Sequence, residues 1–221
     1  CKPDLVGFSV PFPGNLYSAL RCAQWIRQNF PQVKIVMGGG YVNTELRSLT
    51  DPALFDFIDY LVFDDGELPL LRIMDGGELI RTLYRDDAGS IIRVSFDSKE
   101  NIPFAESGTP SYEGLLQNNY INMIELTNPM HALWSNGKWN KLMLAHGCYW
   151  GKCAFCDGAL DYVKRFDQAP VELIVDRMEA VIAQTGQTGF HFVDEAAPPA
   201  LLRKLAEEII RRKLTVSYWT N

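Results

Sequence analysis

The sequence predicts an α/β protein in which two parallel-sheet parts are joined by a hairpin and a linker. Strand-like apolar runs alternate with amphipathic helical runs toward both ends of the chain, as in proteins with parallel sheets. Between them lies a long stretch without periodicity. The expected parts are residues 1–76 (half of a doubly wound domain), residues 77–139 (a hairpin and linker) and residues 140–221 (a second α/β unit).

Six elements are expected in the first part. In order, they are strand 4–10, helix 15–30, strand 34–37, a short helix from Asn43 or Thr44 to about Leu49, strand 59–63 and helix 68–74. Leu16, Leu20 and Ala23 recur at helical spacing. Pro31 ends that helix. Strands that alternate with helices of this length need right-handed crossovers, so we expect them to be parallel.

The middle of the chain has a different pattern. Residues 79–96 predict a β-hairpin with its turn between Asp86 and Gly89. Residues 97–139 are polar and aperiodic, and they predict an irregular linker that wraps over the surface. A loop of that length usually carries a function or extends between domains.

The second part begins near Lys141. Its expected elements are strand 142–145, a helix that begins at Pro170, strand 189–193, helix 201–210 and strand 214–219. Proline suits the first turn of a helix because the N–H that it lacks needs no partner there. The strand at 142–145 leads directly into a loop with three cysteines.

Composition excludes several classes of protein. Hydrophobic residues make up 47% and charged residues 22% of the 221 residues, as in ordinary globular proteins. The net charge of −6 argues against a nucleic-acid surface, and no apolar run approaches the ~20 residues of a membrane span. We expect neither nucleic acid nor a membrane as a partner. The chain enters a strand just after Cys1 and ends at Asn221 just after another, which suggests a piece of a longer protein.

Three of the five cysteines lie within one short loop, at Cys148, Cys153 and Cys156. A disulfide framework would spread an even number through a small secreted chain, whereas this pattern suits a metal site in a reducing cytoplasm. Cys1 and Cys22 are expected to be bystanders. Cys22 is expected to pack on the apolar face of the first helix, as buried free cysteines commonly do.

Thiolates bind zinc and iron–sulfur clusters. Structural zinc takes four protein ligands, and His146, two residues before Cys148, is a candidate for the fourth. The loop follows the C-terminal end of a strand in a βα unit, where α/β barrels place their active sites. That position favours a centre held by three thiolates with one open coordination position. A structural zinc remains the alternative.

A family resemblance lies at residues 147–156, where the sequence is Gly-Cys-Tyr-Trp-Gly-Lys-Cys-Ala-Phe-Cys. This run resembles the cluster motif of radical S-adenosylmethionine (SAM) enzymes, and more narrowly of those with an N-terminal cobalamin-binding domain. The usual motif has three and then two residues between its cysteines. Here four residues separate Cys148 from Cys153, as in a subset of the cobalamin-type members. The resemblance implies a flavodoxin-like cobalamin domain followed by the start of a radical SAM partial (βα) barrel.

The same resemblance implies that Cys148, Cys153 and Cys156 hold a [4Fe–4S] cluster whose fourth iron binds SAM. An electron, supplied by a reductant such as flavodoxin or ferredoxin, would split SAM to methionine and a 5′-deoxyadenosyl radical. That radical would abstract hydrogen from the substrate, with the protein orienting the cofactor and excluding water.

Four further residues are assigned to SAM by resemblance. Phe155 would pack near the adenine, and Arg165 would meet the SAM carboxylate. Asp194 and Glu195 would accept hydrogen bonds from the methionine amino group. Taken by themselves, the residues have simpler interpretations: an exposed acidic loop for the two carboxylates and a solvated basic patch around Arg165.

Cobalamin is the further cofactor that the resemblance implies. Its nucleotide tail would lie against Ser9 and the glycine loop of Gly38, Gly39 and Gly40. The acidic turn at 64–67 resembles the turn that ends this domain in relatives. The family's motif for an axial histidine is absent. The histidines of the chain, His131, His146 and His191, occur in other contexts. The simpler interpretations are an ordinary glycine turn and an acidic first turn of a helix.

The expected activity is SAM-dependent radical chemistry on an unidentified small-molecule or peptide substrate. Cobalamin-dependent methyl transfer and rearrangement are the reactions that the resemblance suggests. The competing class is non-catalytic: a zinc-stabilised α/β binding protein. A third interpretation is a piece that is inactive because its barrel is incomplete.

Overall fold

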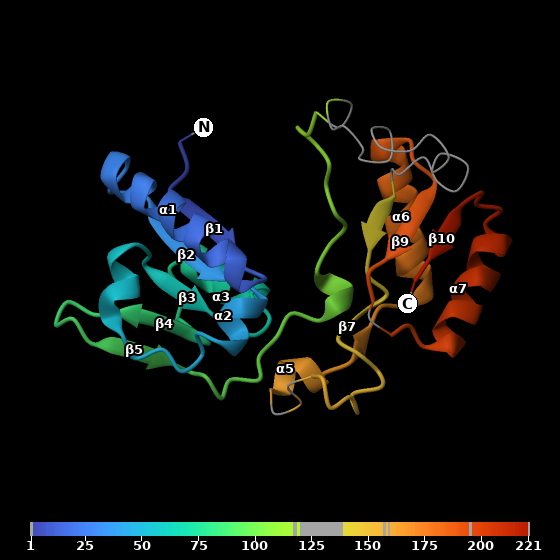
Figure 1. Cartoon of the computed structure of the whole chain (residues 1–221). Helices are drawn as coiled ribbons and strands as arrows, with labels where there is room; N and C mark the ends of the chain where they lie inside the picture. The colour runs from blue at the N-terminus through green and yellow to red at the C-terminus, as the bar shows by residue number, and fades with distance from the viewer. Residues whose placement is uncertain are drawn as a thin grey trace. The chain divides into compact units, whose positions relative to one another are not determined.

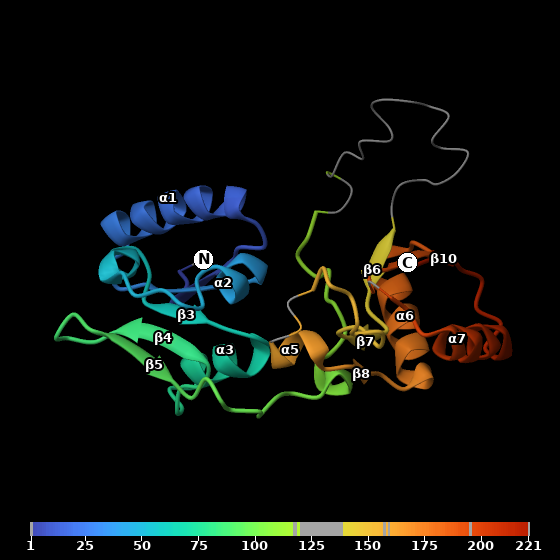
Figure 2. The same cartoon turned by 60° about the horizontal axis from the view of Figure 1, so that its bottom comes forward.

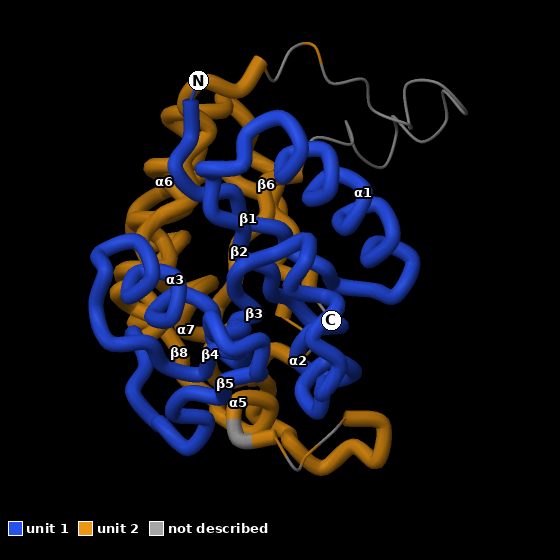
Figure 3. The backbone as a smooth tube through the Cα atoms, turned by 90° about the vertical axis from the view of Figure 1, so that its left-hand side faces the viewer, with its two compact units in different colours: residues 1–102 blue, residues 103–221 orange. Residues whose placement is uncertain are grey.

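The computed structural model describes residues 2–116, 119, 139–156, 158, 160–194 and 196–220. The chain divides into two compact units between Ile102 and Pro103 (Figure 3). Each unit has its own sheet and its own buried core. The protein is therefore of the mixed α/β class, as the sequence predicts.

A five-stranded mixed sheet forms the first unit (Figure 1). Its strands, in sheet order as in chain order, are β1 (Leu5–Ser9), β2 (Lys34–Gly38), β3 (Tyr60–Val62), β4 (Thr82–Arg85) and β5 (Ile91–Val94). The first three strands are parallel, and the last two pair antiparallel. The parallel arrangement expected for the first three strands is confirmed.

The helices of this unit are α1 (Pro13–Asn29), α2 (Gly40–Thr44), the 3-10 helix η1 (Pro52–Asp56) and α3 (Glu67–Met74). α1 begins at Pro13, whose fixed φ suits a first helical turn. Its inward residues Ala19 and Ala23 are small and buried, so the helix lies close against the sheet. Ile35 and Met37 of β2 are fully buried in the same core.

Cys22 does not pack as the sequence analysis expected. It lies in α1 directly before the buried Ala23, but its side chain is exposed. Neighbouring residues of a helix point in directions about 100° apart, so one can face the core while the next faces solvent. The expected packing role of Cys22 is therefore wrong.

The hairpin belongs to the first sheet. Arg85 pairs with Ile91 across its turn, and β4 in turn pairs with β3, which places Leu83 opposite Leu61. Both leucines are fully buried. The sequence analysis grouped the hairpin with the linker, because a pattern of period two does not reveal which strand the segment will join.

A buried arginine holds the chain that follows the hairpin. Arg81 is 2% exposed, and its backbone has φ +43°. Its guanidinium donates hydrogen bonds to the carbonyl oxygens of Ser98 (3.2 Å), Glu100 (2.6 Å) and Asp65 (3.2 Å). One side chain thus joins residues 98–100 to the acidic turn at 64–67.

In the second unit, a parallel three-stranded sheet has the order β10–β9–β6. The strands are β6 (Asn140–Leu142), β9 (Gly189–Phe192) and β10 (Ser217–Trp219). Two helices, α6 (Val171–Thr185) and α7 (Pro199–Arg211), lie side by side against it (Figures 1 and 2). Phe190 and Phe192 of β9 are fully buried in the core between sheet and helices.

A second, two-stranded sheet follows β6. It pairs β7 (Ala145–His146) antiparallel with β8 (Asp167–Gln168), and the short helix α5 (Asp161–Lys164) lies between them in the chain. The expected strand at 142–145 is therefore wrong in its bounds. The ladder stops at Leu142 because the next inward N–H, that of Leu144, donates to the carboxylate of Asp194 instead.

Part of the expected linker lies along α6. It includes the 3-10 helix η2 (Phe104–Glu106). The buried Arg177 of α6 donates to the carbonyl oxygens of Phe104 (3.1 Å) and Ala105 (2.9 Å), and Gln184 accepts a hydrogen bond from the backbone N–H of Tyr112 (2.8 Å). Residues 117, 118 and 120–138, which include His131, lie outside the described part of the chain.

None of the described helices combines the length and the apolar character that a membrane span requires.

Candidate functional site

The cysteine loop leaves the second sheet after β7 and returns at β8. Cys148 is half-buried, whereas Cys153 and Cys156 are exposed, and all three are free thiols. Aromatic residues accompany them: Phe155 is 97% exposed, and Tyr149 and Trp150 are also exposed. Apolar rings that lie so open to water are typical of surfaces that a ligand or another segment covers.

The loop has a closed base. Ala145 pairs with Gln168 and His146 with Asp167, so the two ends of the loop run antiparallel. The N–H of Ala169 donates to the carbonyl oxygen of Leu144 at 3.1 Å, which extends the closure by one step. The three thiols therefore lie in a segment whose ends are held by backbone hydrogen bonds.

Gly147 makes this closure possible. Its φ of +75° lies in the left-handed region, which side chains disfavour. A Cβ atom at this position would overlap the carbonyl oxygen of Arg165 and lie 3.0 Å from the carbonyl carbon of that residue. The residue directly before the first cysteine must therefore be glycine for the two backbone segments to cross.

The thiols are not gathered around one point in this structure. Across residues 2–116, 119, 139–156, 158, 160–194 and 196–220, no group of three or more His, Cys, Asp or Glu side chains is arranged to hold a metal ion. The donors themselves suit zinc or an iron–sulfur cluster, because three free thiols lie on one loop with a closed base. By chemistry the donor set fits such a group, and the side chains would have to turn toward one another to bind it.

His146 was the candidate fourth ligand for zinc. Its ring nitrogen Nε2 lies 3.3 Å from the carbonyl oxygen of Tyr162. The imidazole is therefore oriented toward the backbone of the returning segment. Binding zinc through Nε2 would require that contact to break.

Asp194 is buried, at 5% exposure, and is not part of an exposed acidic loop. Its carboxylate accepts the backbone N–H of Leu144 (3.1 and 2.9 Å) and of Ala145 (3.0 Å). Burial raises the pKa of this carboxyl above its ordinary value, while the hydrogen bonds from Leu144 and Ala145 act in the opposite direction. Asp194 thus fixes the turn from which the cysteine loop starts. Glu195 lies outside the described residues.

The expected basic patch is only partly exposed. Arg165 is half-buried, and Lys164 before it is exposed. Gly147 crosses the backbone of Arg165. Arg165 therefore lies at the base of the loop, next to the residue that precedes Cys148.

A separate pocket of about 390 Å³ lies in the first unit, at the C-terminal ends of its parallel strands. The residues that line it are Gly7, Phe8, Ser9, Val36, Gly38, Gly39, Val62, Gly66, Glu67 and Leu70. The structure thus brings together three of the predicted cobalamin residues, Ser9, Gly38 and Gly39. Gly40 is not among the lining residues. Gly66 and Glu67 come from the acidic turn, which was also singled out by sequence.

Two of the glycines that line this pocket, Gly38 and Gly39, allow close packing of the protein around them. A Cβ at Gly38 would lie 2.9 Å from Cγ2 of Val62, and one at Gly39, where φ is +108°, would lie 2.7 Å from the backbone nitrogen of Val10. Gly7 also lines the pocket, and the sequence analysis missed it. Its position two residues before Ser9 on the same strand, and therefore on the same face, would have revealed it.

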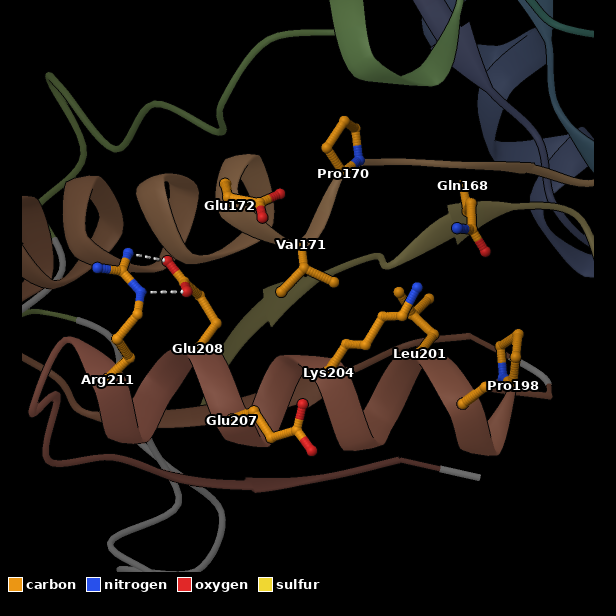
Figure 4. A pocket seen from close by; sticks show the side chains of 11 residues that line it. Gln168, Pro170, Val171, Glu172, Pro198, Leu201, Lys204, Glu207, Glu208 and Arg211 are labelled. Atoms are coloured by element: carbon orange, nitrogen blue, oxygen red, sulfur yellow. Dashed lines mark hydrogen bonds and ion pairs between the residues drawn. The ribbon is translucent and has the colours of Figure 1, made fainter.

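A second hollow, of about 570 Å³, lies between the start of α6 and α7 (Figure 4). None of the predicted site residues lines it. Its most prominent contact is an ion pair of Glu208 with Arg211, and Arg212 binds the same carboxylate. These hydrogen bonds lower the pKa of Glu208 to about 2. Because Arg212 also pairs with Asp176 of α6, the network joins the two helices.

Comparison with known protein families gave no matching model, and comparison with curated proteins gave no match either.

Proposed function

We propose that this chain is part of a radical SAM enzyme and that Cys148, Cys153 and Cys156 bind a [4Fe–4S] cluster. The observation that carries the proposal is the loop itself: three free thiols, held between β7 and β8, follow a strand of a parallel α/β sheet. Ligands of open α/β sheets bind beyond the carboxyl ends of the strands, which is where this loop lies. The resemblance of residues 147–156 to the radical SAM motif supports an iron–sulfur cluster as the bound group.

When bound, the cluster supplies the electron that cleaves SAM to methionine and a 5′-deoxyadenosyl radical. The chain's own residues would prepare the site. Gly147 lets the loop close, and Asp194 holds the N–H groups at its start. Phe155, which is exposed in this structure, offers a flat surface for an adenine ring. Arg165 offers a cation for the SAM carboxylate.

The first unit would supply a cobalamin site. Its pocket is lined by Ser9 and by four glycines, Gly7, Gly38, Gly39 and Gly66. At Gly66 a Cβ would meet nothing within 4 Å, so a flat ligand can approach the backbone there. The lining is largely apolar with one hydroxyl and one carboxylate, from Ser9 and Glu67, which suits a large organic ligand more than a bare ion. Methyl transfer or rearrangement would follow from the two cofactors together. A cytoplasmic location and a flavodoxin or ferredoxin reductant belong to the same proposal.

Anaerobic reconstitution with iron and sulfide tests the proposal. We expect about four irons per chain and a brown protein. Cys153→Ala should abolish the uptake. Cys22→Ala is the matched control, because Cys22 is an exposed free thiol in the first unit and should leave the uptake unchanged.

Binding of one zinc with no uptake of iron would contradict the enzyme proposal and favour the zinc-stabilised binding protein. His146→Ala would then separate the two arrangements, since it should weaken a zinc site that uses His146 and leave a three-thiolate cluster intact.

A further inference from the structure

One face of the three-stranded sheet β10–β9–β6 is turned away from its helices. Phe190 and Phe192 are buried in the helix-covered core, so His191 between them points to the opposite face. Lys141 of β6 and Trp219 of β10 are the register partners of His191 on either side. These three side chains form one line across three strands, which we call the Lys–His–Trp row.

The members of the row contact one another. Nζ of Lys141 lies 2.5 Å from Nδ1 of His191, and the rings of His191 and Trp219 stack with centroids 3.6 Å apart and planes 8° from parallel. An ammonium can only donate, so Nδ1 accepts and the imidazole proton lies on Nε2. Burial and the charge of Lys141 both lower the pKa of His191, which favours this neutral form. Trp219 remains 45% exposed.

Apolar side chains flank the row along the strands. Trp139 lies against Gly189 toward the start of the strands, where a Cβ would be 3.1 Å from the indole. Met143 and Val193, beyond the row, are 38% and 39% exposed. Within the described part of the chain, no carboxylate forms an ion pair with Lys141. Among the residues that the structure describes, the face therefore carries one unbalanced ammonium and one N–H donor beside exposed apolar and aromatic surface.

We propose that the Lys–His–Trp row binds a planar organic anion. Its carboxylate or phosphate meets Nζ of Lys141 and the Nε2–H of His191, and its ring packs on the exposed surface of Trp219. Charge complementarity selects an anion, because the ammonium keeps two donors after its bond to Nδ1. The indole and the apolar flanks select a flat ring over a bare ion. This site needs no metal and is distinct from the thiols of the cysteine loop.

Ring ¹³C and ¹⁵N NMR signals of His191, assigned with His191→Gln, provide the test. Benzoate and phenyl phosphate are titrated into the chain without iron, and benzamide serves as the uncharged match of benzoate. We expect both anions to shift the His191 signals at millimolar concentrations. Because benzamide lacks the charged contact, it should bind about tenfold or more weakly than benzoate. The tighter of the two anions identifies which acid group the site prefers.

Lys141→Met should weaken benzoate by about tenfold or more, whereas Lys204→Met, at an exposed lysine of α7, should not change it. Equal binding of benzoate and benzamide, or full affinity in Lys141→Met, would overturn the role of charge. Absence of any shift at His191 would overturn the site. If Lys141→Met does not fold, the comparison of benzoate with benzamide in the wild-type chain still decides. Anion binding without iron uptake would leave this inference standing and remove the proposed cluster.

Discussion

Replacing Gly147 by alanine should open the base of the cysteine loop. An alanine at φ +75° costs about 1–2 kcal/mol because its Cβ crowds the backbone. The added methyl group would also overlap the carbonyl oxygen of Arg165 and lie 3.0 Å from its carbonyl carbon, so one of the two segments must move. That movement breaks the β7–β8 pairing, whose hydrogen bonds contribute about 0.5–1.5 kcal/mol each. The free energy of unfolding should fall by about 2–5 kcal/mol.

Two glycines provide matched controls. Gly186, which ends α6, has φ +68° and no atom within 4 Å of a built Cβ, and Gly151 has φ +56° with its nearest neighbour at 3.9 Å. Gly186→Ala and Gly151→Ala should therefore lower the free energy of unfolding by about 1–2 kcal/mol, which is the cost of placing alanine in the left-handed conformation. Any additional loss of stability in Gly147→Ala measures the effect of the close approach between Gly147 and the backbone of Arg165.

Urea denaturation measures these free energies. Hydrogen exchange at Ala169, whose N–H donates to the carbonyl oxygen of Leu144, reports the closure of the base directly. Exchange at Ala169 should be much faster in Gly147→Ala and unchanged in Gly186→Ala. A Gly147→Ala protein that is no less stable than Gly186→Ala, with exchange unchanged, would refute the argument from backbone crossing.

Two other predictions concern charged side chains. Arg81→Met should lower the free energy of unfolding by about 2–4 kcal/mol, because three carbonyl oxygens lose a buried donor. Limited proteolysis of this variant should then cut first near residues 98–100. Resistance to cleavage at these residues would contradict the prediction. The pKa of Glu208 lies at about 2 in the folded chain against a usual 4.5, so its stabilisation is present above the usual value and lost as the pH falls toward 2. Glu208→Gln should remove that part of the acid dependence of the melting temperature; an unchanged pH profile would show that the ion-pair network contributes nothing.

Sequence periodicity predicted much of the fold, because burial imposes it. β1, β2 and β3 were expected within a few residues of where they lie, since each is an apolar run between turn residues. The break between Leu142 and Ala145 was not expected. It depends on the carboxylate of Asp194, which reaches across from a strand end about fifty positions later in the chain.

The parts of the candidate site that lie within one short segment were predictable from the sequence. The parts that depend on which strands become neighbours in the sheet were not. The three cysteines are recognisable in the sequence by their close spacing. The burial of Asp194 could have been inferred, because it continues the inward alternation of Phe190 and Phe192. The same alternation places His191 on the opposite face, but no local pattern indicates that Lys141 and Trp219 are its neighbours.

The closed base of the cysteine loop also has a consequence for the entropy of any group that bridges its thiols. Bringing two points of a free chain together costs conformational entropy that grows with the logarithm of the length between them, about 0.6 kcal/mol per doubling. In this loop the pairing of His146 with Asp167 has already joined the ends. A bridging group therefore closes only the short segments between neighbouring cysteines. By the same linkage, binding at the thiols would make the β7–β8 pairing harder to open, so the loop and its ligand would stabilise each other.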